Sequence, residues 1–588
     1  MLAQNGKAMV KVLIADSATQ QEEYAAAELR HYLNLMTATA FDLVKPEELA
    51  EQDKIIAIGS AAEKLGIALD ASLGEDGFTI KTLDGNIAIT GGKRGVIYGV
   101  YELLEAMGCR FFTPTSEKIP CKPSLPLPML NTTQKPVIEY RLHSYKDLMQ
   151  FPRFAVKSRI NARCEIPEDF GGSIQYAWFV HSFEREIITP DEYFDSNPEY
   201  FSMVDGVRKG NFSQLCLTNP DVLKITVEKV RTALRNRPDC KIISVSQNDW
   251  YFNCTCPPCA ELDLKEKSNA GSLIYFVNQV AEQIEAEFPD VVIDTLAYNY
   301  SRQAPKNIRP RHNVCVRLCS IECCFSHSFE ACDDDTRKTL KPDGTRSHFI
   351  EDLREWAKVC DRLYIWDYTT GFAHYPAPHA NWGVLQPNMQ SFVKNNVKGV
   401  FEQACGALGG STDLNELRAY IICKLLWDAD CDIEKHMQEF TDFYYGAAAP
   451  YILEYIKVIS EKVEKDNIHT GFNDQCDKPY LTDEMLDIYE GIFEKAEQAV
   501  IGDALRHARV AKARLSFRWV RIKNNQMLKN IVDPDEVNKF FEDWRAHGLT
   551  RIDEWVNSET TLRALLENKW RGTEFYMPYW NKEGKERL

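Results

Sequence analysis

The chain has 588 residues, which is too long for a single ordinary hydrophobic core, so roughly two to four domains are expected. Hydrophobic residues make up 44% and charged residues 26%, as in globular proteins, and no apolar run approaches the ~18 residues of a membrane span. The formal net charge of −17, with no basic aromatic stripe to offset it, argues against a nucleic-acid partner.

The compartment stays open. The segment from Met1 to Gly6 has no apolar stretch of the kind that forms a signal peptide. The chain is therefore expected to be cytoplasmic, or periplasmic or secreted if a signal peptide was removed ahead of Met1. The 18 cysteines are too few for a disulfide scaffold, so they do not decide the compartment.

The N-terminal part predicts an α/β module. A strand-like segment at residues 9–15 precedes a helix whose cap is expected at Asp16 or Ser17, followed by early acidic residues. Two further strand-like segments flank Asp84-Gly85, which is a hairpin signal. Alternating strands and helices of this length favour a small mixed domain.

A glycine-rich stretch follows from Gly91 to Phe112. Gly91, Gly92 and Gly95 fit neither a Walker loop nor a dinucleotide-binding fingerprint, so a turn into a packed helix is favoured over a phosphate cradle. Taken together, Gly-Gly, Arg-Gly, Tyr-Gly, Leu-Leu and Gly-x-Arg-Phe-Phe resemble the N-terminal domain of alpha-glucuronidases. A similar domain precedes the barrel of beta-N-acetylhexosaminidases and O-GlcNAc hydrolases. The resemblance implies a packing domain without catalytic residues.

The middle of the chain alternates strand-like and helical segments, which predicts a parallel sheet with crossover helices. Eight strand-like segments in series predict a (β/α)8 TIM-type barrel: 137–144, 158–165, 212–218, 242–247, 291–298, 314–321, 363–367 and 399–404. From about residue 430, apolar residues recur at helical spacing, and the aromatic segment from Phe575 to Trp580 is expected to pack onto the body. The expected α/β architecture comprises an accessory domain (1–135), the barrel (136–430) and a helical C-terminal region (431–588).

The fourth barrel segment ends in Asn248 and Asp249, followed at once by Trp250 and Tyr251. In an α/β barrel the active site lies at the carboxyl ends of the strands. A carboxylate beside two aromatic rings at this position therefore predicts a substrate site, with a solvated strand end as the alternative.

Four carboxylates lie in or next to the predicted strands: Asp249 and Glu322 follow the fourth and sixth strands, Asp367 ends the seventh, and Glu402 lies in the eighth. Glycoside hydrolysis needs one protonated carboxyl for the leaving oxygen and one ionised carboxylate to attack or to activate water. Asp249 is expected to be the general acid, kept protonated by its aromatic neighbours. Glu322 and Asp367 then compete for the role of nucleophile or base, and Glu402 orients a partner or contacts the sugar.

Aromatic and polar residues near the same strand ends are candidates for binding a sugar, with rim packing as the alternative. The candidates are Asn248, Trp250, Tyr251, His181, Trp366, Tyr368, His374 and Trp382.

The barrel segments also carry two resemblances. Asp249 matches the position where the fourth strand of alpha-glucuronidases carries its general acid, with Asp in place of Glu, and the segments 314–322 and 363–368 resemble strands that carry the other catalytic carboxylates. From residue 137 to about 460 the chain resembles more closely a bacterial domain family of unknown function, DUF4838. The marks are Gln247-Asn248-Asp249, Cys254-x-Cys256-x-x-Cys259, Cys319 to Cys324, Trp366-Asp367-Tyr368 and Phe401-Glu402.

These resemblances imply an exo-acting glycoside hydrolase on an oligosaccharide or polysaccharide, needing no cofactor for catalysis. The alternative from another class is a non-catalytic glycan-binding protein on a degenerate hydrolase barrel. The sugar and the oligomeric state are left open.

Three cysteines follow Asp249 closely: Cys254, Cys256 and Cys259. They are expected to hold a structural zinc or to form a disulfide. A zinc would take its fourth ligand from Cys319, which lies in the sixth predicted strand, or from Cys323, Cys324 or His327, which follow it. A redox dithiol is disfavoured because no thioredoxin-like βαβ pattern surrounds the motif.

Overall fold

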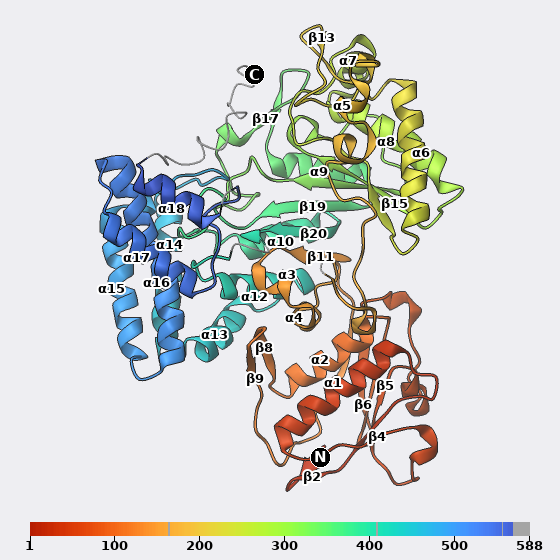
Figure 1. The fold of residues 1–588 in the computed structure, drawn as a ribbon. Helices are drawn as coiled ribbons and strands as arrows, with labels where there is room; N and C mark the ends of the chain where they lie inside the picture. Colours follow the sequence, from red (N-terminus) through yellow and green to blue (C-terminus); the bar gives the residue numbers. More distant parts are fainter. Residues whose placement is uncertain (163–164, 407–409, 556, 569–588) are drawn as a thin grey trace. The chain divides into compact units, whose positions relative to one another are not determined.

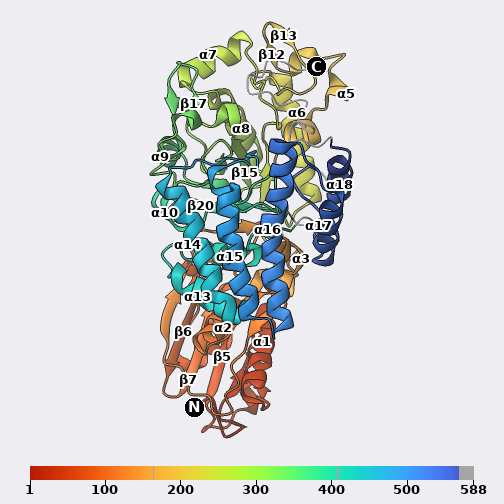
Figure 2. The ribbon, with the colours of Figure 1, turned by 90° about the vertical axis from the view of Figure 1, so that its left-hand side faces the viewer.

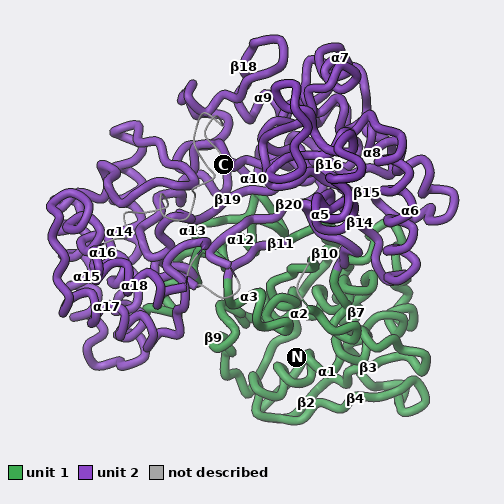
Figure 3. The backbone as a smooth tube through the Cα atoms, turned by 45° about the horizontal axis from the view of Figure 1, so that its top comes forward, with its two compact units in different colours: residues 1–141, 146–173, 416–446 green, residues 142–145, 174–415, 447–588 purple. Residues whose placement is uncertain are grey.

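The computed structural model describes residues 1–588 except 163–164, 407–409, 556 and 569–588 (Figure 1). Two compact units make up the chain (Figure 3). The first comprises residues 1–141, 146–173 and 416–446, and the second comprises 142–145, 174–415 and 447–588. The aromatic segment from Phe575 to Trp580 lies outside the described residues.

The first unit is built on a six-stranded mixed sheet in the order β10-β6-β7-β5-β3-β4. Its strands are β3 (Lys11–Leu13), β4 (Leu43–Val44), β5 (Ile55–Ile58), β6 (Phe78–Leu83), β7 (Asn86–Gly91) and β10 (Asn131–Gln134). The antiparallel pair β6 and β7 is the predicted hairpin, and Asp84 and Gly85 at its tip have φ values of 47° and 84°. Positive φ at both positions is what a two-residue type I′ turn requires.

Helices α1 (Gln20–Thr37) and α2 (Gly95–Ala106) pack side by side on this sheet (Figure 1). The cap of α1 is Thr19 and not the predicted Asp16 or Ser17. The Thr19 hydroxyl accepts from the Glu22 amide at 3.2 Å, and the Glu22 carboxylate accepts from the Thr19 amide at 2.8 Å. This reciprocal capping box needs an acid three residues after the cap, which fixes the start of the helix at Thr19.

The glycines before α2 form a tight turn, as predicted. A Cβ on Gly92 would lie 2.0 Å from the Gly74 carbonyl oxygen, and one on Gly95 would lie 2.0 Å from the Gly77 oxygen. Backbone therefore fills the space that a phosphate would need.

The described residues of the first unit also form two short hairpins, β1 (Ala3–Gln4) with β2 (Lys7–Ala8) and β8 (Arg110–Thr113) with β9 (Ser116–Lys118). Further α-helices there are α3 (Lys146–Gln150), α4 (Pro152–Lys157), α12 (Asn415–Trp427), whose first residue belongs to the second unit, and α13 (Ile433–Tyr444).

The second unit contains a six-stranded sheet in the order β11-β20-β19-β16-β15-β14. The strands are β11 (Tyr140–His143), which spans the boundary of the units, β14 (Ile242–Ser244), β15 (Val292–Ala297), β16 (Val314–Cys319), β19 (Leu363–Tyr368) and β20 (Val397–Gln403). The pairs from β14 to β20 are all parallel. The connecting helices are α6 (Pro220–Asn236), α7 (Pro257–Glu266), α8 (Ala270–Glu285), α9 (Phe349–Val359) and α10 (Leu385–Lys394).

Two of the eight predicted barrel strands are not strands in the described part of the chain. At 158–165, Arg159 has a φ of 59°, which interrupts an extended segment. At 212–218, Leu215 makes only an isolated bridge to Phe201. Residues 176–178 instead lie along the outer edge of β14, where the Ala177 amide donates to the Ile242 carbonyl at 2.8 Å. The described sheet is thus an open parallel sheet and not a complete eight-stranded barrel.

The C-terminal part of the second unit is helical, as the apolar spacing beyond residue 430 predicts, and its helices are α14 (Ala449–Lys465), α15 (Asp483–Ala499), α16 (Ala504–Lys529), α17 (Pro534–Ala546) and α18 (Ser558–Leu566). Successive helices pack on one another (Figure 2). Tyr455, Phe493 and Phe517 meet at centroid distances of 5.0–5.5 Å and form the aromatic core between α14, α15 and α16.

Other short elements of the second unit include α5 (Pro190–Tyr193), β12 (Met203–Val204), β13 (Val207–Arg208), β17 (Thr339–Leu340) and β18 (Arg346–Ser347). Among the helices of the described ranges, none combines the length and the apolar character needed to cross a bilayer.

Candidate functional site

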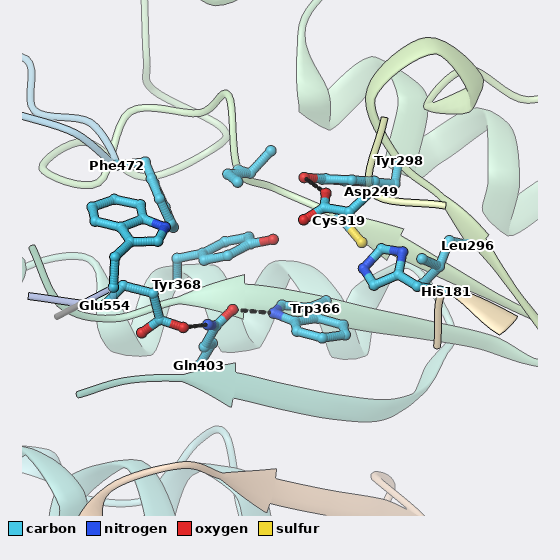
Figure 4. A pocket seen from close by; sticks show the side chains of 12 residues that line it. His181, Asp249, Leu296, Tyr298, Cys319, Trp366, Tyr368, Gln403, Phe472 and Glu554 are labelled. Atoms are coloured by element: carbon cyan, nitrogen blue, oxygen red, sulfur yellow. Dashed lines mark hydrogen bonds between the residues drawn. The ribbon is translucent and has the colours of Figure 1, made fainter. Parts of the chain in front are cut away.

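A cavity of about 310 Å³ lies at the carboxyl ends of β15, β16, β19 and β20 (Figure 4). This is where parallel α/β sheets place their ligands. Four of the predicted site residues line it: His181, Asp249, Trp366 and Tyr368. The other described lining residues are Leu296, Tyr298, Cys319, Ile321, Gln403, Phe472, Glu554 and Trp555.

The loop that carries Asp249 is held by buried side-chain amides. The Gln247 amide donates to the Tyr298 carbonyl at 2.9 Å. The Asn248 side chain donates to the Ser213 carbonyl at 2.9 Å and accepts from the Glu184 amide at 2.8 Å. Asn248 therefore positions its neighbour Asp249 and does not line the cavity, although it was a predicted sugar contact.

Asp249 points into the cavity beside Tyr298 and His181 (Figure 4). The Tyr298 hydroxyl donates to the Asp249 carboxylate at 2.9 Å. This contact fixes the orientation of the Asp249 carboxylate in the cavity.

His181 is held in a left-handed backbone conformation, with φ of 60°, and its amide donates to the Ser246 hydroxyl at 2.9 Å. Its Nδ1 lies 2.9 Å from the Gln247 carbonyl oxygen, to which it donates a proton. Burial lowers the pKa of His181, and the negative charge of Asp249 opposes that shift. The ring is therefore neutral near pH 7, with its proton on Nδ1 and Nε2 as an acceptor.

Glu554 is a second carboxyl in the cavity, and no strand-end pattern in the sequence marks it. Its backbone amide donates to the Phe372 carbonyl at 3.1 Å, and the Tyr375 amide donates to the Ile552 carbonyl at 2.7 Å. These bonds dock the segment after α17 onto the loop after β19. The only local signal was an acid beside an aromatic, Glu554-Trp555, which repeats the pattern of Asp249-Trp250.

The Glu554 carboxylate accepts from the Tyr375 hydroxyl and from the Gln403 amide, the latter at 3.3 Å. The Trp366 indole donates to the Gln403 oxygen at 2.7 Å, which fixes the orientation of that amide. Burial raises the pKa of Glu554 above its ordinary value, although the hydrogen bond from Tyr375 opposes the shift. Figure 4 shows Asp249 and Glu554 on opposite sides of Tyr368.

Asp367 and Glu402 do not line the cavity. They are register partners on β19 and β20, and their neighbours Trp366, Tyr368 and Gln403 do line it. Since side chains alternate along a strand, the two acids point to the opposite face. Burial raises the pKa of Asp367 to about 6, and burial with the charge of Asp367 raises the pKa of Glu402 well above its ordinary value.

Glu322 also lies outside the cavity lining, in the loop after β16. Its carboxylate is 3.6 Å from the Arg302 guanidinium, which pairs in turn with Asp352 at 2.8 Å. Burial raises the pKa of Glu322, and Arg302 opposes that shift. Three of the four predicted catalytic carboxylates are therefore absent from the cavity lining.

The apolar wall of the cavity is formed by Tyr368, Phe472 and Trp555, whose neighbouring rings meet edge to face at 5.5 and 6.3 Å. The other predicted sugar contacts lie elsewhere. Trp250 packs against Phe212, Tyr251 is exposed, His374 bonds Gln475, and Trp382 is buried.

The cysteine motif gathers a fourth sulfur. The Sγ atoms of Cys216, Cys254, Cys256 and Cys259 all lie within 4.8 Å of one another, and all four side chains are buried free thiols. The fourth sulfur comes from Cys216 and not from Cys319, Cys323 or Cys324. The sequence pattern missed it because Cys216 falls in the segment that was predicted to be the third barrel strand.

Two family models match the chain in sequence. Residues 111–457, more than half of the 588-residue chain, match "Domain of unknown function (DUF4838)". Residues 2–103 match "Glycosyl hydrolase family 67 N-terminus". No curated protein matches the chain.

Several solved structures are similar to this one. A family GH115 4-O-methyl-alpha-glucuronidase with specificity for decorated arabinogalactans has a TM-score of 0.57 at 12% identity, covering 95% of this chain and 77% of the other. A GH138 enzyme that targets pectin rhamnogalacturonan II has a TM-score of 0.45 at 10% identity, covering 95% and 92%. A family 89 glycoside hydrolase from Clostridium perfringens has a TM-score of 0.45 at 11% identity, covering 90% of this chain and 66% of the other. At such identities only the first likeness is informative, and it concerns the fold.

Proposed function

The chain belongs to the DUF4838 family, and on that premise we propose that its cavity binds the end of a glycan and hydrolyses a glycosidic bond. The observation that carries this proposal is the presence of two carboxyls, Asp249 and Glu554, in one cavity. They come from distant parts of the chain and are held by different hydrogen bonds. Glycoside hydrolysis requires two carboxyls that differ in protonation state.

The fold supports this proposal by analogy. The GH115 alpha-glucuronidase shares the fold over 95% of the chain, and the N-terminal module matches a glycosyl hydrolase N-terminus. Fold alone does not fix an activity, so the catalytic roles are assigned from the side chains of the cavity.

The environments of the two carboxyls favour distinct roles. Glu554 has a pKa raised by burial, so it retains a proton at higher pH than an ordinary glutamate and is proposed as the general acid. Asp249 receives the Tyr298 hydroxyl and is proposed as the ionised nucleophile or base. This reverses the expectation from sequence, which made Asp249 the acid.

The cavity favours a neutral terminal sugar. Its volume of about 310 Å³ is at the small end of the range for ligand sites, which suits the end of a glycan better than its middle. Tyr368, Phe472 and Trp555 offer rings for the apolar face of a sugar. The described lining residues include no lysine or arginine that would bind a uronate. The nearby Arg317 is paired with Asp294 at 3.5 Å.

A panel of aryl glycosides and native oligosaccharides tests the proposal. We expect turnover of neutral glycosides in preference to glucuronides. Glu554→Gln and Asp249→Asn should each lower turnover of a native linkage by about 10²–10⁴-fold. Glu261→Gln, at an exposed position on α7, is the matched control and should behave as wild type.

Glu554→Gln should lose much less on aryl substrates with activated leaving groups, because such groups leave without protonation. Wild-type turnover in both variants would refute the assignment of these carboxyls. Sugar binding without turnover by the wild-type chain would instead identify a glycan-binding protein.

A further inference from the structure

The four buried thiols near the candidate site have the composition and spacing of a metal centre. Cys254, Cys256 and Cys259 lie between β14 and the first turn of α7, and Cys216 precedes α6. Cys216 and Cys256 have their sulfurs 3.6 Å apart, and all four sulfurs lie within 4.8 Å of one another. Zinc with four thiolates at about 2.3 Å places its sulfurs about 3.8 Å apart. Small adjustments of this cluster would therefore give tetrahedral coordination.

Groups around the cluster are suited to thiolate ligands. The Met203 amide lies 3.3 Å from the Cys254 sulfur and the Arg208 guanidinium lies 3.6 Å from it. The Thr218 hydroxyl lies 3.2 Å from the Cys259 sulfur. Donors of this kind stabilise the negative charge that four thiolates leave on a zinc centre and orient the ligands.

We propose that Cys216, Cys254, Cys256 and Cys259 bind one structural zinc ion. Four protein ligands leave no open coordination position, so the ion stabilises the fold and does not bind substrate. It ties the chain beyond Asp249 to the segment before α6 and to the hairpin of β12 and β13, whose Met203 and Arg208 contact Cys254.

A second group of ligands, on different elements, carries an independent proposal. Cys324, Cys332 and His469 have ligand atoms within 4.8 Å of one another. The Cys332 sulfur lies 3.9 Å from Nδ1 of His469, whose Nε2 lies 3.3 Å from the Asp333 carboxylate. His327 has Nδ1 3.4 Å from the Cys324 sulfur, and its ring centroid is 4.4 Å from that of His469.

We propose a second structural zinc at Cys324, Cys332 and His469, with His327 as the fourth ligand. A Cys2His2 set is a common tetrahedral zinc site, and a carboxylate on the outer nitrogen of a ligating histidine is its usual support. This ion joins the loop after β16 to the segment between α14 and α15. The Phe325 amide already donates to the Thr470 carbonyl at 3.0 Å there, two residues before the cavity residue Phe472.

The metal content of the full-length protein tests both proposals. Protein purified without metal-affinity resin should contain about two zinc ions per chain by elemental mass spectrometry. Cys256→Ser and Cys332→Ser should each lower the content to about one. Cys121→Ser, which removes an exposed free thiol, is the control and should leave it at two.

Cobalt substitution of the wild-type chain gives a readout that does not depend on a variant folding. A tetrathiolate site and a Cys2His2 site should each contribute tetrahedral cobalt bands, and a thiol-blocking mercurial should release both ions. Absence of zinc from the wild-type chain would overturn both proposals, as would iron in its place. A zinc content unchanged by one of the two variants, or a native disulfide between Cys324 and Cys332, would overturn the corresponding site.

Discussion

Each carboxyl in the cavity has a phenolic hydroxyl as a partner: Tyr298 donates to Asp249 and Tyr375 donates to Glu554. What separates them is the rest of their surroundings. Glu554 is buried enough for its pKa to rise despite that bond. The division into acid and base therefore follows from burial and not from residue type.

Removal of the Tyr298 hydroxyl should weaken Asp249 as the ionised partner. We expect Tyr298→Phe to lower kcat by about 10- to 100-fold, since a hydrogen bond to a charged group contributes about 1.5–3 kcal/mol. Steady-state kinetics on one native substrate measures this, and Tyr275→Phe on the exposed face of α8 is the control. An unchanged kcat would show that the Tyr298 hydrogen bond does not support the role of Asp249 in turnover.

Removal of the Tyr375 hydroxyl should raise the pKa of the other carboxyl, Glu554. The Tyr375 hydrogen bond lowers the pKa of Glu554, so Tyr375→Phe should raise that pKa further. A general acid is lost as pH rises through its pKa. The alkaline limb of the kcat/KM profile should therefore move to higher pH in this variant. An alkaline limb at the wild-type pH would show that a group other than Glu554 sets it.

The raised pKa of Asp367 predicts how the stability of the protein depends on pH. Its pKa is about 6 in the folded chain, above the ordinary 3.8, because the side chain is buried. A raised carboxyl pKa favours folding at low pH, and this contribution is lost as pH rises from about 4 to 6. Asp367→Asn should therefore be more stable than wild type at pH 7, with little difference at pH 4.

Thermal unfolding at both pH values measures this difference in stability. Turnover of the same variant tests whether Asp367 takes part in catalysis. Wild-type turnover would agree with the position of Asp367 outside the cavity lining. An inactive but stable variant would support its predicted role as nucleophile or base.

At the scale of elements, the buried acid Asp76 joins several segments of the first unit. Asp76 pairs with Arg94 and, at 3.1 Å, with Arg141, and it accepts from the Asn161 amide at 2.7 Å. Burial raises the pKa of Asp76, but Arg141 and Arg94 outweigh it and hold the pKa below its ordinary value. These contacts join the turn before α2 to β11 and to the segment after α4.

Asp76→Ala should destabilise the protein by about 3–5 kcal/mol, because it removes the buried carboxylate that the Arg94 and Arg141 guanidinium groups share and leaves Arg94 only its pair with the exposed Glu75, at 2.6 Å. Lys93→Ala, next to Arg94 but paired with the exposed Glu168, should cost less than about 1 kcal/mol. Denaturant unfolding measures both values. Turnover by the folded fraction should be unchanged in each, and a hundredfold loss would mean that this module contributes to the site.

The helices were predictable from sequence because their cores are set by local periodicity. In α14, Ile452, Ile456 and Ile459 recur at three- and four-residue spacing and are all buried. Segment 212–218 shows where local pattern fails. Its apolar residues suit a strand, but the side chain of Gln214 instead bonds the Asn248 amide and carbonyl, so the segment anchors the Asp249 loop.

The site was predictable only in part, because some of its residues are placed by tertiary contacts and not by local pattern. Asp249, Trp366 and Tyr368 were found because strand ends carry active sites. The face to which Asp367 points depends on strand register, which the sequence pattern does not determine. Glu554 and Cys216 reach their sites through tertiary docking, which leaves no periodic signal in the chain.

At the scale of the whole molecule, the proposed site is assembled from the strand ends and from the segment after α17, both within the second unit. Binding of a sugar should therefore protect both parts together. We expect product sugar to slow amide hydrogen exchange in residues 247–251 and 551–555, and to leave β3 in the first unit unchanged. Protection confined to residues 247–251 would remove Glu554 from the site.

The position of Glu554 has a consequence for the comparison of relatives. The matched family model ends at residue 457, so it contains Asp249 but not the proposed acid. A homologue that retains Gln-Asn-Asp yet lacks the segment equivalent to 552–555 would keep a sugar-binding surface and lose protonation of the leaving group. Such chains should behave as lectins, and a survey that scores the matched region alone would count them among the hydrolases.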